Sequence, residues 1–390
     1  MDFKLSDEQL AVSEAAKGLL SGMVDAERTT AVELSAERID RELWKALADA
    51  DLLGLAVPEA DGGAGFGLTE LCLLLEAQGN TVAPVPLWAT LVLGALPLAR
   101  FGSKAQRARW IPGVVAGEVF LTAALNGSAS SRKSMPPVRA TAASASGSAD
   151  GWVLEGTELA VPQAHLADRI VVPARTESGG VLLALVDPQA PGVTLERAVT
   201  TNREIHPHLH LAGVAVAPGD LFVGPDLGHS VLDFMLVAAT IALCALQVGV
   251  CEAALTKTAA YLNSRQQFGR PLSTFQGTML RAADAAIDIE AMRVTWQNAA
   301  WRFDTGRDAA DAARVAKWQA AERGQRTVHA TQHLHGGMGA DISYPIHRYF
   351  LWGKQIELLL GGPSAQLARL GAEIAEHALA QAEAEAEVAT

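Results

Sequence analysis

One interrupted stretch in the last third of the chain carries the residue types best suited to binding a phosphorylated ligand. It covers residues 261–276, reads YLNSRQQFGRPLSTFQ and lies between two long alanine-rich segments with helical periodicity. Gly269 and Pro271 interrupt helical geometry, so the chain must turn there. Arg265 lies in this turn, and a guanidinium offers two parallel N–H donors to phosphate oxygens. The stretch indicates a helix corner that binds a diphosphate, although an arginine at a helix end more often caps carbonyl groups.

A second glycine-rich stretch lies downstream, over residues 333–350, and reads HLHGGMGADISYPIHRYF. Glycines in such a run let a backbone approach another group closely. Together the two stretches resemble the flavin-binding C-terminal domain of the acyl-CoA dehydrogenases. The residues that carry this resemblance are Arg265, Gln267, Phe268, Gly269, Pro271, Leu272, Phe275, Gln276, the run 335–339, Tyr344, Pro345, Arg348 and Tyr349.

The resemblance implies an α+β fold with three parts: an N-terminal helical domain (1–117), a middle β-domain (118–225) and a C-terminal four-helix bundle with a tail (226–390). The periodicity of the sequence agrees with this division. A helical pattern starts after Ser6, an N-cap candidate, and an alternating pattern rich in β-branched residues replaces it near Val119. Helical periodicity returns after Pro225, and the dense alanines there favour closely packed helices and a subunit interface.

Individual elements follow from breakers and caps. In the N-terminal part we expect helices at 68–78 and at 100–112, with Ser103 as the cap of the second. In the middle part we expect strands at 152–159, 169–174, 181–186, 193–196 and 211–217. In the C-terminal part we expect helices at 230–262, 276–304, 307–334 and 363–382. Segment 126–151 is so rich in Ser, Ala and Gly that we expect an irregular or mobile loop. The alternating Ala-Glu tail, 380–390, is expected to fray.

Composition excludes several classes of function. A formal net charge of -12 argues against a nucleic-acid surface, which needs clustered Lys and Arg. We find no apolar run of membrane-spanning length without a charge or breaker, and the N-terminus lacks the apolar core of a signal peptide, so we expect a cytoplasmic protein and no membrane contact. Cys72, Cys244 and Cys251 lack metal-ligand spacing and are expected to fill core space.

Three histidines are separate candidates for a metal site. His206, His208 and His210 alternate, so on a strand all three side chains would face one side. Pro207 interrupts strand pairing, and no acidic or cysteine partner accompanies them, so we predict no metal site.

In the family that the sequence resembles, FAD lies at a subunit interface, and each complete site draws on two chains. The half that one chain lends to its neighbour is well kept here. The resemblance implies that Arg265 binds the flavin diphosphate and that Phe268 and Leu272 contact the apolar parts of the cofactor. It also implies that Gln276 donates a hydrogen bond to the cofactor. It also places Gln267, His333, Gly336 and Gly337 at the cofactor, although the family usually has Gln at the position of His333.

The half that each chain builds for its own flavin departs from the family pattern. A Thr-Glu-Pro stretch followed by Gly-Ser-Asp is replaced by LTAALNGSASS, residues 121–131. A Trp-Ile-Thr that packs beside the flavin ring is replaced by LAVP, residues 159–162. Each hydrogen bond lost from the ring edge is worth on the order of 1 kcal/mol.

The family's catalytic base is also missing. Desaturation of a CoA thioester requires a carboxylate that takes the α-proton. The resemblance puts this Glu at Leu360 in most members, or on the first bundle helix at Ala239 in some, and neither residue accepts a proton. Glu357 is the closest carboxylate in sequence to Leu360, and we interpret it as solvated or salt-bridged rather than as a substitute. We therefore predict no catalytic residue in this chain.

These departures resemble the non-catalytic subunits of actinobacterial α2β2 acyl-CoA dehydrogenases that act on CoA thioesters of steroid side chains. The resemblance implies a catalytic partner chain that supplies the Glu and most of the acyl-CoA site, with electron-transfer flavoprotein as the electron acceptor. Two alternatives stay open at this point. One is a redox-inactive homologue that binds acyl-CoA, and the other is a flavin oxygenase on the same fold, which also dispenses with the Glu.

Overall fold

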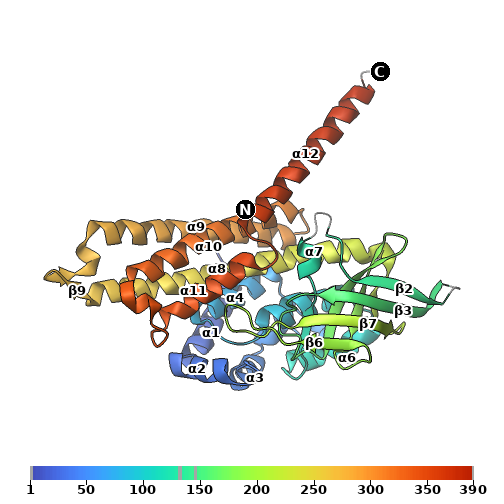
Figure 1. Ribbon diagram of the computed structural model, residues 1–390, viewed down its shortest axis with the longest axis horizontal. Coiled ribbons are helices and arrows are strands. Elements are labelled where there is room, and N and C mark those ends of the chain that lie inside the picture. Colours follow the sequence, from blue (N-terminus) through green and yellow to red (C-terminus); the bar gives the residue numbers. More distant parts are fainter. Residues whose placement is uncertain (1–2, 131–133, 145–146, 389–390) are drawn as a thin grey trace.

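The computed structural model describes residues 3–130, 134–144 and 147–388, and it confirms the predicted fold class. Helices precede and follow a twisted sheet, and the long helix α8 (Pro225–Ser264) runs from the side of the sheet through the C-terminal helices (Figure 1). The changes from helix to strand and back lie between Val115 and Leu121 and between Val223 and Pro225. The division into three domains at the predicted boundaries stays a proposal.

The N-terminal part consists of helices whose starts the sequence predicts well. Ser6 begins α1 and Ser103 begins α6, each with a capping box in which the serine side chain accepts from the third backbone N–H of the helix and that residue's side chain accepts from the serine N–H. The elements are α1 (Asp7–Met23), α2 (Ala26–Leu34), α3 (Arg41–Asp49), α4 (Leu68–Thr81), the π-helical η3 (Trp88–Ala95), α5 (Leu96–Phe101), α6 (Lys104–Val115) and two 3-10 turns, η1 (Leu52–Gly54) and η2 (Glu59–Asp61).

The middle part is an eight-stranded sheet in the order β6-β7-β3-β2-β4-β5-β8, with β1 added in parallel to β4. Its strands are β1 (Leu121–Ala123), β2 (Arg139–Ser144), β3 (Gly147–Glu158), β4 (Arg169–Thr176), β5 (Val181–Val186), β6 (Val193–Glu196), β7 (His208–Val216) and β8 (Leu221–Val223). Strands β4 and β5 are buried on both faces, so they show no alternation. All five predicted strands are present.

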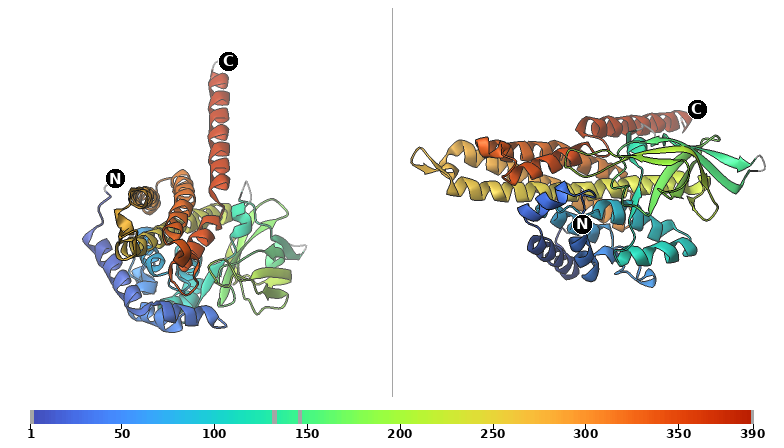
Figure 2. Two further views of the ribbon diagram at one scale, coloured as in Figure 1. Left: turned by 60° about the vertical axis from the view of Figure 1, so that its left-hand side comes forward. Right: turned by 60° about the horizontal axis from the view of Figure 1, so that its bottom comes forward.

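Two sequence-based expectations are wrong. The described residues of segment 126–151 do not form an irregular loop, because they include the short helix α7 (Asn126–Ser130), β2 and the start of β3, and these two strands pair with each other. Residues 131–133 and 145–146 of the predicted loop lie outside the described residues. The tail does not fray at 380, because α12 (Pro363–Val388) continues to Val388 and extends away from the rest of the protein (Figures 1 and 2). In both segments the small residues that suggested disorder are compatible with regular structure once a neighbouring strand or helix turn satisfies the backbone.

The C-terminal part contains α8, α9 (Gln276–Asp304), α10 (Ala310–Leu334), α11 (Ile346–Leu358) and α12. We did not predict α11, which carries Gly353 in its interior. Contrary to the expectation that no apolar run reaches membrane-spanning length, α8 is long and apolar enough to cross a bilayer, with a mean hydropathy of 2.3 in its most apolar window. Because 83% of that window is buried inside the protein, α8 is accounted for as a core helix.

Close contact between α4 and α8 forms the centre of the larger core. A Cβ on Gly79 would lie 2.3 Å from the carbonyl oxygen of Leu246, and a Cβ on Gly249 would lie 1.9 Å from that of Glu76. Only hydrogen fits at either position, so the two helices meet backbone to backbone. Several alanines of α8, including Ala238, Ala242 and Ala245, are buried in this core. The three cysteines are free and buried, as predicted.

A buried ion pair ties the first and last parts of the chain together. Arg348 on α11 donates from Nε to Oε1 of Glu33 on α2 at 2.9 Å and from Nη2 to Oε2 at 3.2 Å. The same carboxylate accepts from Arg203 of the middle part at 3.1 Å, and Arg348 also donates to Thr30 Oγ1 at 2.7 Å. The side chains of Arg348 and Glu33 are only 7% and 8% exposed. One carboxylate of the N-terminal part thus bonds to both other parts of the molecule.

Replacing Arg348 by Ala is expected to destabilise the protein by about 3 kcal/mol, because it leaves the buried carboxylate of Glu33 with Arg203 as its remaining partner. Urea unfolding followed by circular dichroism measures the change. Arg41→Ala is the matched control, since the pair of Arg41 with Glu37 is 54% and 52% exposed and is worth less than about 1 kcal/mol. Equal unfolding midpoints for the two variants would contradict the assigned role of Arg348.

Candidate functional site

The predicted helix corner is a small hairpin at one end of the bundle. Helix α8 ends at Ser264, strands β9 (Gln266–Gln267) and β10 (Arg270–Pro271) pair with each other, and the 3-10 turn η4 (Leu272–Thr274) leads into α9. The two residues at the hairpin tip, Phe268 and Gly269, have φ values of 54° and 78°, as a two-residue hairpin turn requires. The backbone N–H of Leu272 donates to the carbonyl of Arg265 at 2.9 Å and closes the corner.

The predicted cofactor residues of this corner lie on the surface. Arg265, Gln267 and Gln276 are exposed, and Leu272 is half-buried. Phe268 is 90% exposed at the hairpin tip, where its ring contacts Phe275 edge-on at 6.1 Å. A phenylalanine left so far in water is a feature of binding surfaces rather than of cores. The hairpin therefore faces away from the body of its own chain.

The glycine stretch lies at the same end of the bundle. His333 is in the last turn of α10, and the 3-10 turn η5 (Gly336–Ala340) follows. The ring of His335 stacks on that of Tyr261, the residue one turn before Arg265, with centroids 4.6 Å apart. A Cβ on Gly336 or Gly337 would meet no atom within 4 Å, so both backbones border open space. The structure thus brings the two predicted stretches together, while the role of each residue in them stays a prediction.

Arg281 is a residue that the sequence analysis missed. It lies on α9, and its Nη1 is 2.6 Å from Nδ1 of His333 on α10. The two residues are 52 positions apart, so no local pattern connects them. Both line a groove of about 860 Å³ between α9 and α10.

The segments of the middle part that are predicted to depart from the family's flavin contacts are held by their own side chains. Thr122 Oγ1 donates to the carbonyl of Pro162 at 2.7 Å, and Asn126 Nδ2 donates to the carbonyl of Ala160 at 2.8 Å. The N–H of Ala160 donates to Nδ1 of His208 at 3.0 Å. These donors are consumed within the chain, so they are not free to bind the edge of a flavin ring.

A buried carboxyl group lies beside this segment. Glu158, at the end of β3, is 1% exposed and accepts from the N–H of Gly127 at 3.0 Å. Burial raises its pKa to about 7. The hydroxyl of the neighbouring Ser128 is buried without a hydrogen-bond partner among the described residues. Oε1 of Glu158 is likewise buried without a partner among the described residues, so these two side chains are only partly bonded within the chain.

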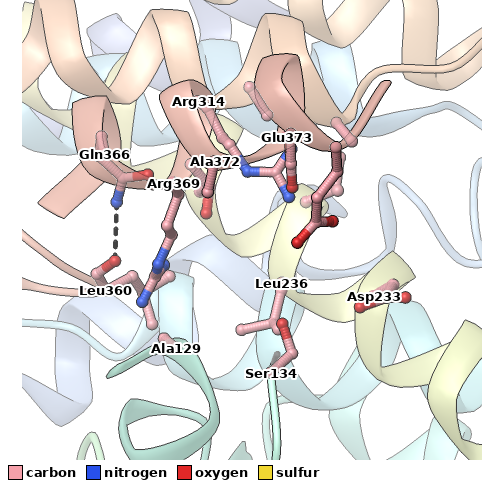
Figure 3. A pocket seen from close by; sticks show the side chains of 15 residues that line it. Ala129, Ser134, Asp233, Leu236, Arg314, Leu360, Gln366, Arg369, Ala372 and Glu373 are labelled. Carbon is pink, nitrogen blue, oxygen red and sulfur yellow. Dashed lines mark hydrogen bonds and ion pairs between the residues drawn. The ribbon is translucent and has the colours of Figure 1, made fainter. Parts of the chain in front are cut away.

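The two predicted base positions are both apolar and buried. Leu360 is 4% exposed and lines a cavity of about 430 Å³ between α8, α10 and α12 (Figure 3). Ala239 is fully buried, and its carbonyl accepts from Trp88 Nε1 at 3.1 Å. Glu357, the nearest carboxylate in sequence, is 6% exposed and pairs with Lys354, as the salt-bridged interpretation predicts. It does not line the cavity.

Other charged groups line this cavity, and sequence reasoning did not find them. They are Asp233 on α8, Arg314 on α10, and Arg369, Glu373 and Glu376 on α12. Arg314 binds Glu373, whereas the guanidinium of Arg369 points toward Leu360 and Ala129 (Figure 3). Burial raises the pKa of Asp233 above its ordinary value. These residues come from helices that meet only in the folded chain.

The three alternating histidines bind different partners. His206 is 1% exposed and pairs with Glu204, His208 accepts from the N–H of Ala160, and His210 lies 3.1 Å from Glu196. Strand β7 begins only at His208, so His206 does not share its face. Within the described ranges, no three His, Cys, Asp or Glu side chains gather in a way that could hold a metal ion.

Comparisons with known proteins agree with this architecture. Residues 6–118 match the model of the acyl-CoA dehydrogenase N-terminal domain, and residues 228–388 match that of the acyl-CoA dehydrogenase C-terminal domain. The chain is 38% identical over 372 residues to the acyl-CoA dehydrogenase FadE27 of Mycobacterium tuberculosis, covering 92% of this chain and 96% of that protein.

Two solved structures are similar over nearly the whole chain. One, a variant of the Tcur3481-Tcur3483 steroid ACAD, is 46% identical, has a TM-score of 0.88 and covers 96% of this chain and 99% of its own. The other, the ChsE4-ChsE5 complex from Mycobacterium tuberculosis, is 37% identical with a TM-score of 0.88 and the same coverage. The chain therefore belongs to the acyl-CoA dehydrogenase family, whose cofactor is FAD and whose reaction is the oxidation of a CH-CH group.

A buried lysine supports the turn that holds Leu360. Lys317 on α10 is fully buried, and its Nζ donates to the carbonyls of Ile356 at 2.6 Å and Glu357 at 3.1 Å. It thereby caps the C-terminal end of α11, where carbonyl groups lack helical partners. Burial lowers its pKa from 10.5 to about 8, because the charged form loses hydration.

This lowered pKa predicts a pH dependence of stability. Between pH 8 and 10.5 the unfolded chain holds the Lys317 proton and the folded chain does not, so the folded state gains stability as pH rises relative to a chain without this group. The stability of the wild type relative to Lys317→Met should increase by up to roughly 3 kcal/mol across this window. Urea unfolding at pH 7.5 and pH 10 measures it. Lys45→Met, which removes an exposed lysine paired with Asp49, is the control, and a pH-independent difference for Lys317→Met would contradict the prediction.

Proposed function

We propose that this chain is one subunit of a heteromeric, FAD-dependent acyl-CoA dehydrogenase, in which it lends the hairpin corner and glycine stretch to a flavin housed mainly by a catalytic partner chain. The partner supplies the carboxylate that takes the α-proton and binds most of the acyl-CoA. Steroid side-chain thioesters are the proposed substrates, because a structural neighbour at 46% identity is described as a steroid ACAD of two named chains.

The observation that carries this proposal is a distance along α8. Thr240 lines the cavity at Leu360, and Arg265 caps the other end of the same continuous helix. At 1.5 Å per residue the two positions are about 38 Å apart along the axis, which is farther than one dinucleotide reaches. A cofactor whose diphosphate binds at Arg265 therefore does not extend to the cavity of the same chain. The hairpin corner serves a neighbour.

The assigned roles follow from the chemistry of the exposed groups. Arg265 binds diphosphate oxygens, Phe268 and Leu272 cover apolar parts of the cofactor, and Gln276 donates a hydrogen bond. Gln267 and the open backbones of Gly336 and Gly337 complete the surface, with His333 beside them. FAD held by these residues would supply the hydride acceptor for oxidation of the CH-CH group. The residues of this chain orient the cofactor and take no proton in the reaction.

The test is co-purification with the catalytic chain. Alone, this protein should be colourless or poorly soluble, and the complex should contain two FAD in a tetramer of two copies of each chain, measured by flavin absorbance and light scattering. Electron-transfer flavoprotein should then accept the electrons. One tightly bound FAD per copy of the lone protein, together with dehydrogenase turnover, would refute the proposal.

A second candidate is a redox-inactive protein that binds acyl-CoA by itself. The cavity of about 430 Å³ beside Leu360 favours it, because Leu236, Val237 and Leu360 provide an apolar wall. Calorimetric titration of the lone protein with an acyl-CoA, next to a flavin absorbance scan, separates the two candidates. Tight binding without flavin supports the second.

In the complex, Arg265→Ala should raise the Kd for FAD by about 10- to 100-fold, because a charge-assisted hydrogen bond to phosphate is worth roughly 1.5–3 kcal/mol. Fluorescence titration of the deflavinated complex measures it. Arg307→Ala is the matched control, since Arg307 is an exposed arginine beyond the far end of α9, stacked over Trp301. Unchanged FAD affinity for Arg265→Ala would argue against the diphosphate role.

A further inference from the structure

The contact between Arg281 and His333 fixes the state of the imidazole ring. A guanidinium has only donors, so the 2.6 Å contact from Arg281 Nη1 requires Nδ1 of His333 to accept. The proton of the neutral ring then lies on Nε2, which becomes a donor. A glutamine side chain, which the family usually has at this position, presents an N–H donor without any such help.

The other arginines of the groove are already engaged. Arg323 and Arg326 both bind the carboxylate of Asp288, which is 3% exposed. Arg281 lines the same groove, and in the described part of the chain it forms no ion pair within 4 Å. Its hydrogen-bond partner is the ring of His333, so its contact serves that ring rather than a carboxylate.

The position of the pair connects it to the glycine stretch. His333 is one turn before Gly336 and Gly337, whose backbones border open space, and the ring of His335 in between packs on Tyr261 of the hairpin corner. Arg281 and His333 are both exposed. The Nε2–H of His333 is therefore available at the surface that carries the proposed cofactor residues.

We propose that Arg281 is a positioning residue of the flavin half-site, which holds His333 in the tautomer that donates from Nε2 to the phosphate or ribose oxygens of the dinucleotide. The pair of Arg281 and His333 thus takes the place of a single glutamine. This inference rests on the proposed function, and it adds a residue of α9 that neither stretch of the sequence contains.

Rescue of one substitution by another tests the inference in the reconstituted complex. Arg281→Ala should raise the Kd for FAD about tenfold, because the ring then samples both tautomers and rotates. His333→Gln should change it less than about threefold, and the double variant Arg281→Ala/His333→Gln should bind FAD as well as His333→Gln alone. A loss from Arg281→Ala that is equal in both backgrounds, or no loss in either, would overturn the proposal.

Two further measurements distinguish a failure of this inference from a failure of the proposed function. Arg326→Ala, in the same groove, leaves Asp288 with Arg323 and should not change FAD affinity. In the full-length chain, imidazole nitrogen NMR should find His333 with its proton on Nε2, and Arg281→Ala should give a mixture of tautomers. If Arg265→Ala weakens FAD binding while Arg281→Ala does not, the positioning role fails alone. If neither does, the proposed function fails.

Discussion

The backbone contact between α4 and α8 is the constraint on which the rest of the structure depends. Gly79 and Gly249 let the two helices approach until each faces a carbonyl of the other. This contact fixes α8, which then carries the cavity residues Asp233 and Thr240 near one end and the hairpin corner at the other. A side chain at either glycine would move one or both of these regions, because a 40-residue helix transmits a local shift along its length.

A second constraint acts where the chain's parts meet. The carboxylate of Glu33 receives Arg348 from α11 and Arg203 from the middle part, and the buried pair is stable because the remaining hydrogen bonds are filled, Thr30 included. Helix α11 is held at its other end by Lys317, whose ammonium donates to two carbonyls just before the Leu360 turn. Charged side chains, Arg348 and Lys317, therefore hold α11 at both of its ends and so position the Leu360 turn. The turn itself contributes no charged group to these contacts.

The sequence predicted those features that depend on neighbours in the chain. Serine caps at Ser6 and Ser103, the breakers around Gly269, and the limits of α9 could all be read from local patterns. Helix α11 was missed because its glycine and aromatic residues lower helical propensity, and packing against α10 and α8 compensates for it. Segment 126–151 was misjudged because small residues favour disorder only when no neighbouring strand pairs with them.

The residues of the candidate site also fall into those that local sequence patterns predict and those that only the folded structure brings together. The stretches 261–276 and 333–350 could be found from their residues and their resemblance to a known family, but Arg281 and Asp233 could not, because each reaches its site from a helix whose position is set by tertiary packing. The contacts of Asn126 and Thr122 could not be predicted from local patterns either, because these side chains donate hydrogen bonds to carbonyl groups of the 160–162 turn. Such contacts join residues about 34 to 52 positions apart, and no periodicity encodes them.

Under the proposed function, the surroundings of Leu360 differ from those that a catalytic carboxylate needs. Arg369 points at Leu360, and in the described residues it has no ion-pair partner of its own. A carboxylate placed at this position would pair with that guanidinium, and the pairing would hold its pKa low and weaken it as a base. The ring-edge donors of the middle part are also consumed internally. The predicted base position is thus apolar, and the donors of the middle part are bonded within the chain, which supports the proposal that the exposed hairpin corner serves another chain.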